Sequence, residues 1–462
     1  LSRRLDERLL WASFGTLVLG NLLVIYAVVT NKASVLYTSY APLQAHWTYY
    51  VGLVFVVIST WLALLNMLLT WRGWKRENPG VRMPLLAHIS IVSYVMWFLA
   101  SLPIAVEFLF FLIPWSFGWV ERTDPLLTRT LFWFTGHAIV YAWLLPAYVS
   151  WYALVPRQAG GKIVSDSLTR LVFILFLLLS IPTGFHHQYT DPGIHEGFKF
   201  VHAILTFGVF FPSLITAFSV MASLEMGGRA HGGRGLLGWI PKLPWGDPSL
   251  SAQLLAMITF VFGGITGLIN ASFTMNQVVH NTTWVPGHFH MTVGSAVAMT
   301  FMGVAYWMVP YLTGRKLWGR KVALASNWIY TIGLLIFARG MISAGLEGMP
   351  RRTFLAQAPY MDPDWLVGRI LTGVGGTLMF VGIALFFVVI AMTIWKGKAG
   401  EAPKDIPWSE TLIEPARNGW ATRLDRIGFW VIVAIILIVI AYGPFFLSYL
   451  PPNYVSPGYR IY

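Results

Sequence analysis

The chain has 462 residues, of which 56% are hydrophobic and only 11% are charged, and its mean hydropathy is +0.64. Soluble domains carry roughly 25% charged residues, so this composition excludes an ordinary soluble fold and favours a protein embedded in a lipid bilayer. There is no cysteine, which excludes disulfides, thiolate-bound metals, iron–sulfur clusters and cysteine nucleophiles. The formal charge of +13 is typical of the basic loops of a membrane protein, and we expect no nucleic-acid partner.

Eleven apolar segments are long enough to cross a bilayer, which takes about 20 helical residues. In chain order they cover residues 9–30, 47–71, 84–114, 127–154, 168–186, 198–224, 250–272, 284–311, 321–346, 365–395 and 427–450. Turn formers such as Asn78-Pro79-Gly80 and Asp191-Pro192-Gly193 separate them. The sequence therefore predicts an all-α, polytopic bundle of about eleven transmembrane helices that forms one integral-membrane domain over residues 1–462.

The distribution of basic residues predicts how these spans are oriented. If successive spans alternate in direction, 23 of the 32 Lys and Arg residues fall on the side of the N-terminus. Cytoplasmic loops carry the excess of Lys and Arg in membrane proteins. We therefore expect a cytoplasmic N-terminus and an external C-terminus.

Five histidines fall at one predicted depth, in the outer third of the membrane. His137 lies about ten residues into the fourth span, which enters from outside. His186 and His187 end the fifth span, and His288 and His290 open the eighth. A lone histidine at this depth is best explained by a hydrogen bond between helices. Five that converge, including an adjacent pair, indicate metal binding, because imidazole is the usual ligand for copper and iron.

The spacing of these histidines divides them among separate centres. Residues two apart on an α-helix point about 200° away from each other, so His288 and His290 cannot share a metal. Because a haem takes a single axial histidine from any one helix, these two are assigned to two haems. The other three histidines are free to converge on a copper ion. Tyr141, one turn after His137, could supply a proton and an electron there, although taken alone it is explained by core packing.

Three segments carry a family resemblance: FWFTGHAIVYAWLLPAY (132–148), GFHHQYTDPG (184–193) and NTTWVPGHFHMTVGS (281–295). They resemble subunit I of the haem–copper oxidases, most closely the B-family, over a stretch from about Val35 to the C-terminus that includes DRIGFW (425–430). The resemblance implies a respiratory cytochrome c oxidase subunit that reduces dioxygen to water with a low-spin haem b, a high-spin a-type haem and copper B. It implies copper ligation by His137, His186 and His187, high-spin haem ligation by His288, low-spin haem ligation by His290, and a covalent link between Tyr141 and His137.

Polar residues on the inner side predict a route for protons. They are Tyr148, Tyr152 and Ser165, together with Thr206, Ser213, Thr216 and Ser219, which form one stripe on the sixth span. Such a stripe is equally well explained by hydrogen bonds between helices. The resemblance favours a single proton path, and with it proton pumping.

Further residues are expected near the haems because of the resemblance. His280, Arg351 and Arg352 are expected to neutralise haem propionates, and Tyr37 and Trp133 to flank the active-site haem. Asn276 stands in a segment where relatives can carry an acid. Without the resemblance, the arginines would be assigned to a solvated loop and the aromatic residues to packing.

The resemblance also implies components beyond these spans. The family pattern has about 13 spans, and neither His46 nor His88 matches the position of the second ligand of the low-spin haem. That ligand is therefore expected either on one of about two further N-terminal spans or on a separate chain. Without cysteine, the two-copper electron-entry centre is expected on subunit II, with cytochrome c or a similar donor. Membrane lipid and dioxygen complete the expected partners, and the expected location is a prokaryotic plasma membrane.

Two alternatives remain at this point. A nitric oxide reductase of the same superfamily would lack the tyrosine and often adds a carboxylate ligand, whereas Tyr141 is present and no carboxylate neighbours the histidines in sequence. A transporter or channel would suit the number of spans but would leave the five histidines unexplained.

Overall fold

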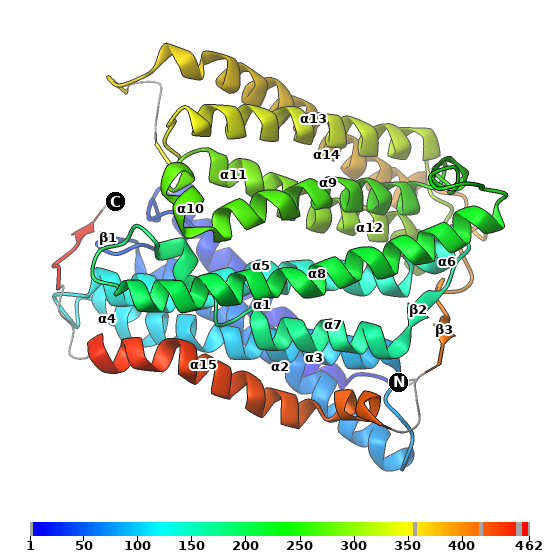
Figure 1. The fold of residues 1–462 in the computed structure, drawn as a ribbon, viewed down its shortest axis with the longest axis horizontal. Coiled ribbons are helices and arrows are strands. Elements are labelled where there is room, and N and C mark those ends of the chain that lie inside the picture. The colour runs from blue at the N-terminus through cyan, green and yellow to red at the C-terminus, as the bar shows by residue number, and fades with distance from the viewer. Residues whose placement is uncertain (1–2, 354–357, 415–418, 450–454, 461–462) are drawn as a thin grey trace. The chain divides into compact units, whose positions relative to one another are not determined.

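The computed structural model describes residues 3–353, 358–414, 419–449 and 455–460 (Figure 1). The chain divides into two compact units that alternate along the sequence. Unit 1 comprises Leu1–Ala142, Arg170–Val209 and Ala416–Tyr462, and unit 2 comprises Trp143–Thr169 and Phe210–Pro415. Three helices, α5 (Pro125–Ala153), α7 (Asp166–Leu179) and α8 (Glu196–Ala230), contribute residues to both units.

Unit 1 is built almost entirely from helices. Besides its parts of α5, α7 and α8, it contains α1 (Glu7–Val29), β1 (Leu43–Gln44), α2 (Trp47–Glu77), α3 (Leu85–Val106), the π-helix η1 (Glu107–Leu112), α4 (Ile113–Ser116), the 3₁₀ turns η2 (Gly184–Gln188) and η7 (Trp420–Asp425), α15 (Ile427–Tyr449) and β4 (Tyr459–Arg460). The short strands β1 and β4 pair in parallel.

Unit 2 is likewise helical. It contains α6 (Val155–Ala159), β2 (Ile163–Ser165), η3 (Ile240–Lys242), α9 (Pro248–Ala271), α10 (Phe273–Val279), α11 (Trp284–Phe289), the π-helix η4 (His290–Val297), α12 (Ala298–Thr313), α13 (Arg320–Leu346), η6 (Pro363–Trp365), α14 (Leu366–Lys396) and β3 (Thr411–Ile413). Strands β2 and β3 pair in parallel.

The expected all-α polytopic bundle is confirmed. Within the described ranges, nine helical segments are long and apolar enough to cross a membrane, and each overlaps one of the expected spans. The two remaining expected spans, 127–154 and 168–186, fall on α5 with 29 residues and on α7 with 14. The fifth span therefore ends earlier than predicted, because Pro182 lacks the N–H that would continue the helix and disfavours helical backbone at the residue before it.

In unit 2, α13 and α14 lie side by side and meet through glycines (Figure 1). A Cβ atom on Gly333 would lie 2.8 Å from the carbonyl oxygen of Gly375, and one on Gly340 would lie 2.5 Å from that of Gly368. Small residues at such positions let two backbones approach closely within a membrane. The packing of this pair therefore depends on the absence of side chains along the seam.

Candidate metal centre

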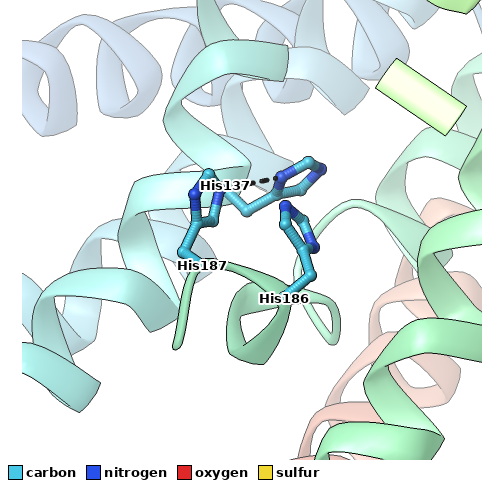
Figure 2. A group of neighbouring side chains, drawn as sticks. All are labelled: His137, His186 and His187. Atoms are coloured by element: carbon cyan, nitrogen blue, oxygen red, sulfur yellow. Dashed lines mark hydrogen bonds between the residues drawn. The ribbon is translucent and has the colours of Figure 1, made fainter. Parts of the chain in front are cut away.

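Three of the predicted histidines come together in unit 1. His137 is on α5, and His186 and His187 are on η2; one nitrogen from each ring lies within 4.8 Å of the others (Figure 2). Nδ1 of His137 is 3.3 Å from Nε2 of His187. Two imidazole nitrogens bound at roughly 2.0 Å to one tetrahedral metal are themselves about 3.3 Å apart. The donor set and its spacing therefore fit a single copper-sized ion.

The turn that carries two of these histidines is held against α5 at Gly184. A Cβ atom at this position would lie 2.3 Å from the carbonyl oxygen of Trp133 and 2.5 Å from the hydroxyl of Tyr442. The N–H of Gly184 donates to that same hydroxyl at 3.0 Å. Only glycine permits this approach, so residue 184 determines how closely His186 and His187 come to His137.

Thr206 on α8 controls the orientation of His186. Its Oγ1 lies 3.0 Å from Nδ1 of His186 and donates its proton to the carbonyl oxygen of His202 at 2.6 Å. A carbonyl oxygen only accepts, so Thr206 must accept the Nδ1 proton of His186. This tautomer leaves the Nε2 lone pair for a metal, which is a frequent arrangement around metal-bound histidines. The sequence assigned Thr206 to the proton path, whereas the structure pairs it with His186.

An aromatic and ionic network extends from His187. The indole of Trp133 stacks on the His187 ring at 3.9 Å between centroids, with 9° between planes. Trp133 donates from Nε1 to the hydroxyl of Tyr40 at 2.6 Å, and the Arg129 guanidinium lies 4.3 Å from the Tyr40 ring centre. Arg129 also donates to both oxygens of Asp191, at 3.0 and 2.8 Å. The sequence predicted that Tyr37 and Trp133 flank the active-site haem; the side chain of Tyr37 is 58% exposed, and Tyr40 is the tyrosine bonded to the indole.

Tyr141 lies on the same face of α5 as His137, as the four-residue spacing predicts. The two ring centroids are 4.8 Å apart and the rings are inclined by 62°. On its other side Tyr141 packs against Phe176 of α7 at 5.5 Å. The phenol is therefore adjacent to a candidate copper ligand.

The other two histidines, in unit 2, contact different helices. Nδ1 of His288 lies 2.8 Å from Oγ1 of Thr266 on α9, and Thr266 donates its proton to the carbonyl oxygen of Gly263. His290 donates from Nδ1 to the carbonyl oxygen of Pro286 at 2.7 Å, and its ring lies 4.4 Å from Phe337 of α13. Both rings thus present Nε2 as the available lone pair. This arrangement fits axial ligands for two separate haems.

The predicted proton-path residues of unit 2 form two hydrogen-bonded pairs. Tyr148 donates to Ser213 at 3.1 Å, and Tyr152 donates to Thr216 at 3.2 Å. Both tyrosines are buried, and Ser219 continues the same face of α8. The hydroxyl of Ser165 accepts from the N–H of Leu168 at 3.3 Å, which caps the start of α7.

Two of the residues expected near the haem propionates, Asn276 and His280, are hydrogen-bonded to each other. Asn276 donates from its amide to the carbonyl oxygen of Asn270 at 2.8 Å, so its Oδ1 faces His280 and accepts the Nδ1 proton at 2.9 Å. Arg351 donates to the side chain of Asn281, beside His280, at 3.3 Å. Arg352 adopts a left-handed backbone with φ of 63°.

The two histidines that did not match a ligand position have structural contacts. His46 is the N-cap of α2, where Nδ1 accepts from the N–H of Thr48. Its pKa is lowered by burial and, secondarily, by the charge of Lys32. His88 is fully buried, with Nε2 3.0 Å from the carbonyl oxygen of Leu424.

Sequence reasoning missed one buried acid in unit 1. Glu107 is 1% exposed and begins the π-helix η1. The sequence did indicate this residue, because Glu107 is the only Asp or Glu within the eleven expected spans. An ionisable residue at such a place is a functional candidate by default.

These observations define a class: a polytopic helical membrane protein with a three-histidine metal site. The sequence model described as "Cytochrome C and Quinol oxidase polypeptide I" matches residues 2–378, and the chain belongs to this family. It is the catalytic subunit of a terminal oxidase, an enzyme that uses haem and copper.

Relatives and a solved structure support this assignment along the whole chain. Cytochrome c oxidase subunit 1 of Thermus thermophilus is 46% identical over 468 residues, covering 100% of this chain and 83% of the relative. Alternative cytochrome c oxidase subunit 1 of Bradyrhizobium diazoefficiens is 28% identical, covering 66% of this chain and 50% of the relative. A heme-copper terminal oxidase dimer solved by cryo-electron microscopy matches with a TM-score of 0.93 and 38% identity, over 99% of this chain and 81% of that chain.

Proposed function

We propose that the chain is one catalytic domain, residues 1–462, that reduces dioxygen to water at a centre made of copper B and a high-spin a-type haem. His137, His186 and His187 hold the copper, His288 the high-spin haem iron, and His290 a low-spin haem b. The observation that carries this proposal is the convergence of three imidazole nitrogens within 4.8 Å, with Tyr141 beside one of them. In the described part of the chain, that ligand group consists of histidines alone, which favours oxygen over nitric oxide as substrate.

The residues around the centre orient its ligands. Thr206 keeps the Nε2 lone pair of His186 available, and Trp133 holds the ring plane of His187 by stacking. When bound, haem and copper supply electrons for cleavage of the O–O bond. Tyr141, which this proposal takes as covalently joined to His137, contributes a proton and an electron from its phenol beside the centre.

Protons for this reaction are proposed to come from the cytoplasm through unit 2. Ser165, Tyr152 with Thr216, Ser219, and Tyr148 with Ser213 form the route, because hydroxyl groups within hydrogen-bonding distance can pass protons along a chain. Thr206 is better explained as a partner of His186. Proton uptake from one side of the membrane is coupled, in this proposal, to proton pumping.

The outer groups are proposed to bind haem propionates. They are His280, Arg351, Arg352 and Asn276, with Tyr37 and Trp133 as aromatic neighbours of the active-site haem. Asn276 is neutral at a position where relatives can carry an acid. A proton that is stored on the outer side of the haem would therefore bind at His280, whose Nδ1–H donates to Asn276.

We expect the complete enzyme to contain other subunits and to lie in a membrane. We propose that subunit II carries the two-copper centre that receives electrons from cytochrome c, because the chain has no cysteine. The enzyme would lie in a prokaryotic plasma membrane with its N-terminus in the cytoplasm, in contact with lipid and dioxygen.

The purified complex provides a direct test. We expect reduced-minus-oxidised optical spectra with bands of a low-spin b haem and an a-type haem, copper bound in equal amount to the a-type haem, and oxygen consumption in an oxygen-electrode assay. Rapid turnover of nitric oxide with negligible oxygen consumption would overturn the oxidase assignment. Vesicles that take up only the protons consumed in water formation would overturn pumping.

A further inference from the structure

Glu107 is the unexplained ionisable group of unit 1. Its side chain is 1% exposed, and Oε2 has no hydrogen-bond partner among the described residues. Within those residues no ion pair involves this carboxyl group either. Burying such a group without a partner is costly inside a membrane, so its presence in the only acidic position of eleven expected spans calls for a function.

The backbone around Glu107 departs from a regular helix. Pro103 lies inside α3 near its end, and residues Glu107–Leu112 form a π-helix. Short π-helical segments lie frequently at functional sites. The irregular backbone immediately precedes and includes the acid, so its orientation differs from that in an unbroken α-helix.

A contact between α3 and α5 locates this acid relative to the histidines. The hydroxyl of Thr135 accepts from the N–H of Ile104 at 3.2 Å and donates to the carbonyl oxygen of Ala100 at 2.6 Å. Thr135 is thereby inserted into the hydrogen-bond ladder of α3. His137 follows Thr135 by two residues, and Glu107 follows Ile104 by three.

The acid and the proposed copper ligand are therefore close in height along their two helices. If consecutive spans run in opposite directions, a rise of about 1.5 Å per residue puts Glu107 and His137 about 7.5 Å apart along the helix axes, on two neighbouring helices. Phe108, next to Glu107, also belongs to the buried cluster that includes Trp133, whose ring stacks on His187.

On α5, which is bonded to α3 through Thr135, Arg129 lies near the height of Glu107, but its guanidinium donates to both oxygens of Asp191. On α2 the nearby titratable groups are Tyr49 and Tyr50, whose hydroxyls bond the carbonyl oxygen of Leu36 and the N–H of Ala45. On α3 the remaining titratable groups, His88 and Tyr94, lie toward its opposite end. Helix α4, which also packs against η1, has no ionisable residue. With Arg129 engaged by Asp191, the metal centre is the positive charge to which we expect the carboxyl group to respond.

We propose that Glu107 is a proton-binding site linked to the redox state of the three-histidine centre. This inference rests on the proposed function. When the centre gains one electron from the oxidase's donor, it loses one positive charge, and the Glu107 carboxylate takes one proton from water to become the neutral acid. When the centre is reoxidised, the acid returns that proton to water and the carboxylate is again balanced by the metal charge.

The test is a redox-induced infrared difference spectrum of the purified holo complex. On reduction we expect the parent enzyme to gain a carboxylic-acid C=O band that shifts in heavy water. This band should be lost in Glu107→Gln and displaced in Glu107→Asp. Glu225→Gln, which alters a partly exposed acid bonded to Arg229, is the control and should leave it unchanged.

Proton uptake on reduction, followed with a pH indicator, gives a second readout and should be smaller in Glu107→Gln than in the parent. If the variant keeps its haem bands and bound copper but shows the same carboxylic-acid band and proton uptake as the parent, the inference is wrong and the proposed function stands. If the parent complex itself has no redox-active haem bands, the proposed function fails, and the inference with it. Should Glu107→Gln not assemble, the band position in Glu107→Asp decides alone.

Discussion

The Nδ1–H of His186 donates to the hydroxyl of Thr206, and that hydroxyl donates to the carbonyl oxygen of His202 in α8. One threonine thus decides which nitrogen of a candidate copper ligand is available. The tautomer matters as much as the position of the ring, because the other tautomer in the same position would point an N–H, and no lone pair, at the metal.

Replacing Thr206 by the isosteric valine should weaken copper binding. Partners of metal-bound histidines typically contribute 10–100-fold to metal affinity, so we expect about that loss for Thr206→Val when copper is titrated against a chelator. Thr206→Ser keeps the hydroxyl and should bind like the parent. Thr259→Val, which removes a hydroxyl bonded only within α9, controls for loss of a buried threonine. Equal copper affinity in all variants would contradict this role.

Removing the hydroxyl of Thr135 should destabilise unit 1. In Thr135→Val the N–H of Ile104 and the carbonyl of Ala100 lose the hydroxyl that bridges α3 to α5, and loss of a buried hydrogen bond costs about 0.5–1.5 kcal/mol. We expect a lower thermal midpoint for the purified complex and recovery in Thr135→Ser. Thr128→Val removes a hydroxyl on the same helix that bonds only its own backbone; a similar drop in that variant would show that the bridge to α3 is unimportant.

Gly184→Ala should disrupt the copper site specifically. The added methyl group would overlap the backbone of α5 at Trp133, so η2 must move away from His137. We expect loss of copper with retention of the low-spin haem spectrum, measured by metal analysis and optical spectroscopy. Gly373→Ala adds a methyl group where the structure leaves open space and should retain copper. Full copper occupancy in Gly184→Ala would refute this explanation.

Tyr148→Phe and Tyr152→Phe should slow oxygen reduction without changing the optical spectra. Each removes the hydroxyl that donates to the Ser/Thr face of α8, and loss of a positioned proton-transfer group typically costs 10²–10⁴-fold in rate. Stopped-flow measurements of the reduced enzyme with oxygen would resolve the proton-coupled phases. Tyr311→Phe, at a tyrosine that stacks on Trp307, should react at the parental rate. Unimpaired kinetics in both path variants would exclude this route.

The membrane spans and the three-histidine cluster were predictable because the bilayer restricts the solutions. Each apolar segment must be helical, so alternation of direction alone puts His137, His186 and His187 at one depth. The tyrosine beside His137 followed from the four-residue spacing on one helix. These inferences use only local periodicity and the thickness of the membrane.

The contacts that orient the site could not be predicted in the same way. Gly184 is fixed by the hydroxyl of Tyr442, 258 residues along the chain, and no local pattern reports such a contact. Thr206 shares helical spacing with Ser213 and Thr216, but spacing does not reveal which partner a hydroxyl meets. Tyr37 and Tyr40 are both aromatic residues of one loop, and only the loop backbone decides that Tyr40 reaches Trp133.

The glycine seam between α13 and α14 has a consequence for biosynthesis. These two helices meet at glycines and at a hydrogen bond, from Ser326 to the carbonyl oxygen of Gly382, so they need no cofactor to find their register. They can pair in the lipid as a hairpin as soon as α14 has been inserted, while the C-terminal helix is still on the ribosome. Phe337, whose ring packs against His290, belongs to that hairpin. One wall beside the proposed haem ligand would therefore be in place before the cofactor arrives.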